Sequence, residues 1–107
     1  MKLASIEHIS NISPINGYDN IELISILNFK AFAKKGIFCK DTLCIFIQCD
    51  TNIDYITDNS LINNIKILPY EINNIYADGI VLPLSLYPYE PSIGLDISEF
   101  FHITKTF

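Results

Sequence analysis

Basic and aromatic residues alternate in one short window of this chain, and together they could bind nucleic acid. The window contains no acidic residue. Lysine ammonium groups attract phosphates, while aromatic rings stack on unpaired bases. We therefore predict a nucleic-acid-binding site formed by Lys30, Phe32, Lys34, Lys35, Phe38 and Lys40. The alternative is that the lysines form an ordinary solvated edge and the phenylalanines, Phe29 included, belong to the core.

Other reactive side chains show no catalytic pattern. His8 and His102 have no Asp, Cys or Ser at a suggestive spacing. Cys39, Cys44 and Cys49 are five residues apart, so neighbours would lie on opposite faces of an extended strand. This spacing favours buried or half-buried free thiols over a metal site. The sequence therefore predicts no catalytic residue, no metal ligand and no cofactor.

Two further patterns have both a functional and a plain structural interpretation. Asp50, Asp54 and Asp58 recur every four residues and would share one face of a helix as a cation site, or simply form an acidic surface. Several tyrosines stand near prolines and could form an amphipathic contact surface, or the rim of a small barrel. These are Tyr55, Tyr70, Tyr76, Tyr87 and Tyr89.

The charge balance limits the classes of partner. Seven basic residues, all lysines, stand against twelve acidic ones, for a net charge of -5. Proteins that grip nucleic acid through phosphates usually carry a basic stripe with arginine forks, so strong nonspecific binding is not expected. From Asp41 onward nine acidic residues meet only Lys66 and Lys105. Such an acidic surface could instead occupy a basic cleft on another protein.

Length and hydropathy predict one compact domain over residues 1–107. Half of the residues are hydrophobic, which is enough for a core. No apolar stretch approaches the roughly 20 residues that span a bilayer, and the first residues lack a signal-peptide pattern. We therefore expect a cytoplasmic protein that does not bind membranes. The richness in Ile and Asn fits an AT-biased coding sequence, as in some viruses, phages and microbes.

β-branched and aromatic residues with frequent turn signals predict an all-β barrel or sandwich. We expect a loop over residues 14–20, and residues 43–47 read as the buried central strand because they form a continuous apolar run. A helix or loop should fill residues 51–64, and residues 96–101 could form one helical turn capped by Asp96. The predicted strands are residues 2–12, 21–27, 28–34, 43–47, 65–68 and 80–84.

The order of several motifs resembles the N-terminal OB-fold domain of ATP-dependent RNA ligases. The resemblance covers nearly the whole chain and implies a small five-stranded OB-like barrel with a short helix or loop between strands 3 and 4. It also implies contact with RNA or single-stranded nucleic acid. The matching pieces are Lys2 to Ile6, Pro14-Ile15 with Asp19 to Leu23, Lys34-Lys35-Gly36 followed by Phe38 and Asp41, Gly79 to Ser85, and Ile103 to Lys105.

Departures from that family weaken the implied activity. The family's basic fourth strand corresponds to residues 65–71, where only Lys66 is basic, and Asp50 alone remains of the acidic residues that end the central strand. No Lys-x-Asp-Gly motif occurs, so the lysine that takes AMP in such ligases has no counterpart. We therefore do not expect an enzyme. tRNA-binding domains share the proline and aspartate before the second strand, but usually carry more lysine and arginine.

Two main hypotheses follow. The chain is a non-catalytic OB module that binds RNA or single-stranded nucleic acid weakly. Alternatively, it is an acidic protein-interaction module, of viral or phage type, that docks on and inhibits or positions a nucleic-acid-processing enzyme or a host factor. A third hypothesis is a piece of a longer ligase. Free sheet edges beside residues 43–47 would leave a dimer open.

Overall fold

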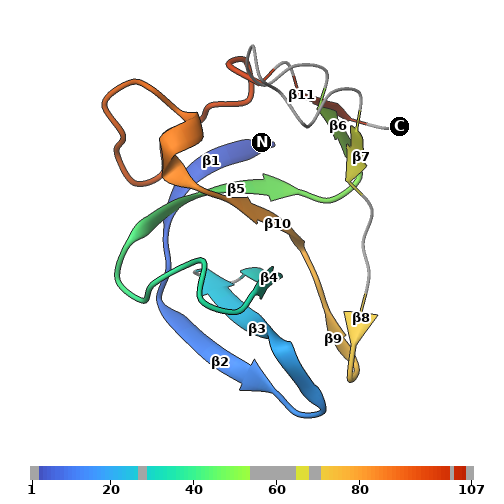
Figure 1. Ribbon diagram of the computed structural model, residues 1–107. Coiled ribbons are helices and arrows are strands. Elements are labelled where there is room, and N and C mark those ends of the chain that lie inside the picture. Colours follow the sequence, from blue (N-terminus) through green and yellow to red (C-terminus); the bar gives the residue numbers. More distant parts are fainter. Residues whose placement is uncertain (1–2, 27–28, 54–64, 68–70, 102, 106–107) are drawn as a thin grey trace.

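The computed structural model describes residues 3–26, 29–53, 65–67, 71–101 and 103–105, and in them the chain is all-β, as predicted (Figure 1). A single 3-10 turn, η1 (Leu84–Leu86), is the one helical element among these residues. None of the described residues form a helix long and apolar enough to cross a membrane. The strands are β1 (Ala4–His8), β2 (Asn11–Ile15), β3 (Tyr18–Ile26), β4 (Phe29–Lys34), β5 (Leu43–Gln48), β6 (Thr51–Ile53), β7 (Ile65–Ile67), β8 (Glu71–Ile72), β9 (Ile75–Tyr76), β10 (Gly79–Leu82) and β11 (Ile103–Lys105).

Two antiparallel three-stranded sheets form the body of the molecule. One has the order β1-β5-β10 and the other β2-β3-β4 (Figure 1). Strand β5 lies in the middle of the first sheet, and its residues from Cys44 to Ile47 are buried on both faces. The predicted central strand at residues 43–47 is therefore confirmed.

The two sheets are linked at both sides of the barrel. On one side β1 leads into β2, and on the other β4 meets β10 through Lys30 and Asp78. The Asp78 N–H donates to the Lys30 carbonyl oxygen at 2.7 Å, and the Lys30 N–H donates to the Asp78 carboxylate at 2.7 Å. The strand order is thus β2-β3-β4-β10-β5-β1. These two hydrogen bonds, one to the backbone and one to the side chain, join β4 to β10 in place of a continuous ladder.

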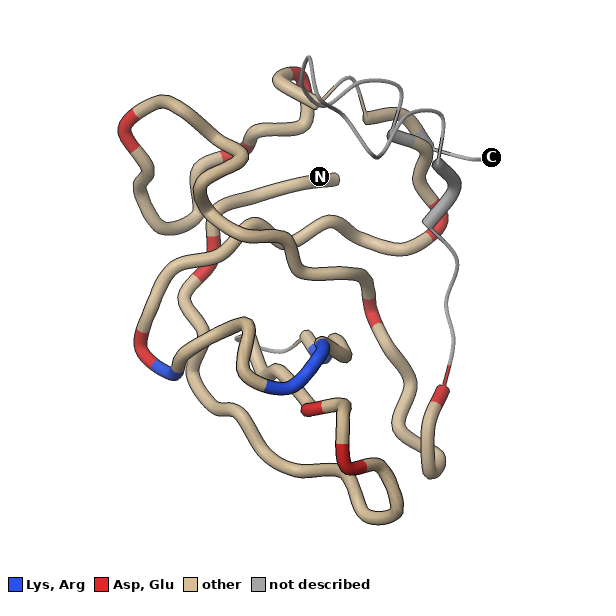
Figure 2. Tube along the Cα trace, in the orientation of Figure 1, with Lys and Arg blue, Asp and Glu red and all other residues tan. Residues whose placement is uncertain are grey.

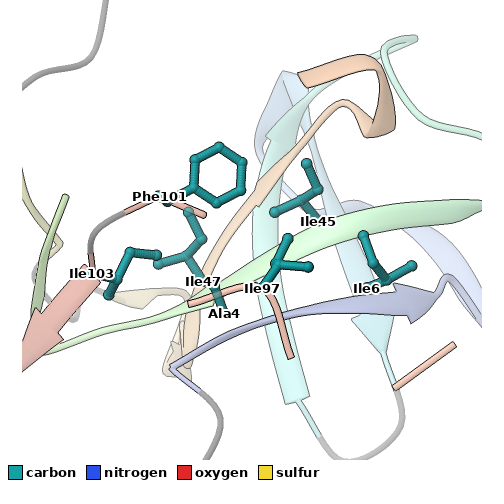
Figure 3. Close-up of a cluster of buried hydrophobic side chains, with 7 residues drawn as sticks. All are labelled: Ala4, Ile6, Ile45, Ile47, Ile97, Phe101 and Ile103. Carbon is teal, nitrogen blue, oxygen red and sulfur yellow. The ribbon is translucent and has the colours of Figure 1, made fainter. Parts of the chain in front are cut away.

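The hydrophobic core has an inner and an outer part. Inside the barrel, residues of β2, β3, β4, β5 and β10 meet around Phe46, Ile24 and Val81. On the outer face of the β1-β5-β10 sheet, a second cluster packs under residues 83–101 and β11 (Figure 3). Its buried members are Ala4, Ile6, Ile45, Ile47, Ile97, Phe101 and Ile103.

The predicted loop at residues 14–20 is wrong. β2 continues to Ile15, a two-residue turn at Asn16-Gly17 follows, and β3 begins at Tyr18. Gly17 has φ +86°, which a glycine adopts without steric cost. An Asn-Gly pair between two strands is a strong hairpin signal, and in this turn Gly17 supplies the positive φ. The segment is therefore a β-hairpin with a register shift after Pro14.

The segment after β5 also differs from the prediction. Residues 51–53 are strand β6, not helix or loop, while residues 54–64 lie outside the described part of the chain. β6 pairs with β7 and β11, so the described part of the predicted fourth barrel strand, residues 65–67, belongs to a separate small sheet. Asp50, at φ +62°, and a Thr51 hydroxyl that donates to the Gln48 carbonyl turn the chain out of β5. A loop at residues 35–42 joins the third and fourth barrel strands, β4 and β5.

The outer edge of β1 is covered by the chain itself. Ile6 donates its N–H to the Leu95 carbonyl at 3.0 Å and accepts from the Gly94 N–H at 2.7 Å, while the Ile97 N–H donates to Ala4. This edge is therefore occupied and does not offer a second copy a place to pair. Residues 98–101 form turns rather than a helix, and the Asp96 carboxylate accepts from the Ser98 N–H at 3.0 Å as a cap would.

Candidate nucleic-acid interface

Strand β4 carries the first three predicted site residues on one face. Lys30, Phe32 and Lys34 alternate with alanines, and the alanines point into the barrel core. Both lysine side chains are exposed, whereas Phe32 is only 7% exposed. The strand therefore presents two charges to solvent on either side of a buried ring.

The β8–β9 hairpin buries that ring. Phe32 packs with Ile15 and Ala77, and Ile72 and Ile75 of the hairpin pack against this cluster. At the hairpin tip, the Asn73 side-chain amide donates to the Asn16 carbonyl oxygen at 2.7 Å and so ties the two hairpins together. OB folds commonly bind oligonucleotides on the face of strands 2 and 3 between two flanking loops. In this chain the β2–β3 and β8–β9 hairpins stand in the place of these loops, and they contact each other beside Phe32.

The remaining three site residues lie on the loop between β4 and β5. Lys35 and Lys40 are exposed at its two ends, and Phe38 is half-buried against the barrel core. Gly36 lies at φ +86°, and its N–H donates to the Glu22 carboxylate at 3.3 Å. Figure 2 shows the blue basic segments on β4 and on this loop. Phe32 and Phe38 therefore pack into the protein, while the lysines stay in solvent.

Two hollows border the end of β4. One, of about 430 Å³, lies at the β2–β3 hairpin and includes Asp19, Glu22 and Lys35 in its wall. The other, of about 330 Å³, lies between Ile21, Lys34 and Ile72. Lys34 and Lys35 thus stand side by side in the sequence at the rims of two concave surfaces.

One contact between an imidazole and a carboxylate could not be predicted from the sequence. His8 at the end of β1 and Asp41 in the β4–β5 loop place Nε2 and Oδ1 3.3 Å apart. Their separation along the chain hides this contact, which the register of β1 against β5 creates. Because both side chains are well exposed, such a pair contributes less than about 1 kcal/mol to stability. His102 lies outside the described residues.

The three aspartates predicted to share one face of a helix do not begin such a helix at Asp50. Asp50 occupies the bend between β5 and β6, so it does not begin a helix, and Asp54 and Asp58 lie outside the described residues. Of the tyrosines, Tyr76 is exposed on β9, and the rings of Tyr87 and Tyr89 lie 5.5 Å apart. Tyr55 and Tyr70 are outside the described part of the chain.

The three cysteines are free and differ in exposure. Cys44 is buried and Cys49 half-buried, as predicted, but Cys39 is exposed because it precedes β5 and lies in the loop. Within the described residues, no three His, Cys, Asp or Glu side chains gather as a metal site would require. Burial, and after it the negative charge of Glu7 opposite on β1, raises the pKa of Cys44 to about 12.

Stability should fall above pH 9 because of Cys44. An unfolded chain ionises this thiol near its ordinary pKa of 9.0, whereas the folded chain keeps the proton up to about 12. Between these values the unfolded state is favoured by up to about 1.4 kcal/mol per pH unit. Urea denaturation at pH 7 to 10 should show this slope in the wild type and a shallower one in Cys44→Ala. Cys39→Ala, at the exposed position, should keep the wild-type slope; parallel curves for all three proteins would contradict the assignment.

Comparisons with known proteins agree with this architecture. Solved structures of Naegleria gruberi RNA ligase superpose on the chain with TM-scores of 0.82 for the form with PPi and 0.81 for a mutant with ATP and Mn. The identities are 23% and 22%, and 98% of this chain is covered in both. The chain spans about a third of that ligase, 35% of its length. At this identity the likeness shows the fold. No match is found among curated proteins.

A family model assigns the chain directly. The model, described as an OB-fold domain, matches residues 3–84, which include every strand of the barrel from β1 to β10. The match and the strand order confirm the predicted OB-like fold, and the superposition shows that this fold is shared with the RNA ligase structures. On these grounds the chain belongs to this family of OB-fold domains.

Proposed function

We propose that this chain is a non-catalytic OB-fold module that binds RNA or single-stranded nucleic acid weakly. The observation that carries the proposal is the position of Lys34 and Lys35, exposed at the rims of two hollows, with Lys30 on the same strand face. The structural likeness to an RNA ligase supports nucleic acid as the ligand class. The lack of a Lys-x-Asp-Gly motif in the sequence supports a non-catalytic role.

Phosphate attraction should supply most of the affinity. Phe32 and Phe38 are packed into the protein, so base stacking contributes little, and the net charge of -5 opposes a polyanion. Nonspecific binding of this electrostatic kind has dissociation constants of about 1 to 100 μM at physiological salt. We expect this protein at the weak end of that range and steeply dependent on salt.

Replacing Lys34 and Lys35 together by glutamine should lower the affinity for a single-stranded RNA at 50 mM salt by at least about 10-fold. Each lost phosphate contact also removes about 0.7 from the slope of log affinity against log salt. Fluorescence anisotropy with a labelled oligonucleotide over 25 to 200 mM salt measures both quantities.

The matched control is Lys66→Gln with Lys105→Gln. Both double variants change the net charge from -5 to -7, since each removes two lysines. If the two double variants lose the same affinity, the effect is one of overall charge and the site is wrong. If the wild type does not bind at 25 mM salt, the proposed function itself fails.

A second candidate function is docking on a basic protein partner. It is favoured by the acidic second part of the chain together with exposed apolar side chains there, such as Tyr89 at 63% and Ile93 at 64% exposure. Exposed tyrosines in an acidic setting suit a cationic protein surface better than a phosphate backbone.

A further inference from the structure

A chain of aromatic rings runs from the core to the surface in residues 87–101. Phe101 is fully buried in the outer cluster, and the Phe100 ring meets it edge-on with centroids 4.9 Å apart. Phe100 in turn contacts Tyr87 at 5.2 Å and Tyr89 at 5.8 Å, both edge-on. We call Tyr87, Tyr89 and Phe100 the aromatic platform. Its rings brace one another and are anchored to a buried residue.

The backbone under the platform is also held in place. The Tyr87 N–H donates to the Leu84 carbonyl at 2.9 Å, and residues 94–97 are bonded to the edge of β1. In Figure 1 the orange segment that carries these residues forms a loop beside β1 and β5. Tyr89 is nevertheless 63% exposed. A large ring that is exposed and already ordered loses little conformational entropy when a partner covers it.

The charged residues of the segment that carries the platform have one sign. Residues 83–101 contain Glu90, Asp96 and Glu99 and no basic residue. The Asp96 carboxylate accepts from the Ser98 hydroxyl at 2.7 Å, whereas Glu90 and Glu99 are exposed next to Tyr89 and Phe100 in the sequence. Exposed carboxylates on the segment that carries the rings repel phosphates and attract cations. A guanidinium group suits both the exposed ring and the carboxylates, since it stacks on aromatic faces and pairs with carboxylates through two hydrogen bonds.

We propose that the aromatic platform docks an arginine-bearing segment of a protein partner. The inference rests on the second proposed function, and it specifies which surface docks the partner and which side chain of the partner that surface binds. The platform ring Tyr89 stacks on the guanidinium plane, and Glu90 and Glu99 supply the complementary charge. Tyrosine and arginine are also the residue types most enriched among the energetically important contacts of protein interfaces. The lysines of β4 are not part of this surface.

The test is a titration of the whole protein with three synthetic peptides, followed by NMR. The peptides alternate glycine with arginine, with lysine or with neutral citrulline. We expect the arginine peptide to bind most tightly and to shift the resonances of Tyr87, Tyr89 and Phe100. Tyr89→Ala should weaken binding about 2- to 5-fold, since an exposed cation–π contact is of that order. Glu90→Gln with Glu99→Gln should weaken it further and flatten its salt dependence.

Tyr76→Ala is the matched control, because this tyrosine is 66% exposed on β9 and lies outside the platform. It should bind the arginine peptide as the wild type does. Unchanged binding in the Tyr89 and glutamate variants would overturn the platform while leaving an acidic interaction module in place. Failure of the wild type to bind either cationic peptide would overturn both. Equal affinity for the lysine peptide, or platform shifts on addition of single-stranded RNA, would refute the proposed chemistry.

Discussion

Gly79→Ala should strongly destabilise the barrel, because no space exists for a side chain at this position. A Cβ atom on Gly79 would clash with the Ile47 carbonyl oxygen and would lie 2.9 Å from the Phe46 ring carbon Cζ. Both residues belong to the central strand β5, and Phe46 is 1% exposed. The nearest atom is backbone, which cannot turn aside as a flexible side chain could.

Relief of this clash would separate β10 from β5. Gly79 stands opposite Gln48 and Ile80 opposite Ile47, so a shift of β10 breaks the ladder on one side of the central strand. Overpacking inside a core costs about 1 to 3 kcal/mol when side chains can adjust, and more when they cannot. We therefore expect a loss of about 3 kcal/mol or more, a large part of the stability of a small domain. Far-UV circular dichroism and thermal denaturation measure it.

Gly36→Ala provides the control. Gly36 lies at φ +86° in the β4–β5 loop, and nothing lies within 4 Å of a Cβ there. The substitution therefore costs only the left-handed backbone conformation, about 1 to 2 kcal/mol. The variant should fold and melt a few degrees below the wild type. A Gly79→Ala protein that melts no lower than Gly36→Ala would show that β10 does not pack against β5 as described.

Sequence patterns identified the elements whose burial is regular along the chain. Residues 43–47 form a continuous apolar run because β5 is covered on both faces by the inner and outer clusters. Residues 28–34 alternate because one face of β4 is turned into the barrel. In both cases local periodicity records the environment of a whole strand.

The misassigned segments depend on context that periodicity does not record. β6 and β7 are three residues each, too short to show a period, and β11, which pairs with β6 on its other edge, lies far along the chain at Ile103–Lys105. Pro14 suggested a loop, yet β2 is an edge strand and tolerates a residue without an N–H. The Asn16-Gly17 pair carried the correct information, since it is a hairpin turn signal.

In the candidate site, the solvent exposure of the lysines could be predicted from the sequence, whereas the burial of Phe32 could not. Lysine side chains remain in solvent almost wherever the chain places them, so their exposure follows from residue type. Phe32 faces away from the barrel, as the alternation on β4 requires, and only packing near the β8–β9 hairpin decides that it is buried. That contact joins segments distant in sequence, as does the pair formed by His8 and Asp41.

Ser5→Ala and Glu7→Met should change stability in opposite directions. Both residues are 5% exposed on β1, opposite Phe46 and Cys44 of the inner cluster. The Ser5 hydroxyl donates to Glu7 Oε2 at 2.6 Å, while Glu7 Oε1 has no hydrogen-bond partner among the described residues. Ser5→Ala removes the hydrogen-bond donor of the Glu7 carboxyl group, which should lower the free energy of unfolding by about 2 kcal/mol. Replacing the carboxyl group by an apolar side chain of similar length removes a desolvated polar group.

The double variant Ser5→Ala with Glu7→Met is therefore expected to be the most stable of the set, by about 1 to 3 kcal/mol over the wild type. Urea denaturation of the four proteins in the cycle gives the coupling between the two positions. Glu71→Met, at an exposed position of β8, should stay within about 0.5 kcal/mol of the wild type. Because hydrophobicity increases equally in both glutamate variants, a gain confined to position 7 isolates burial as its cause. A double variant less stable than the wild type would mean that the interactions of the Glu7 carboxyl group inside the barrel contribute more free energy than its desolvation costs.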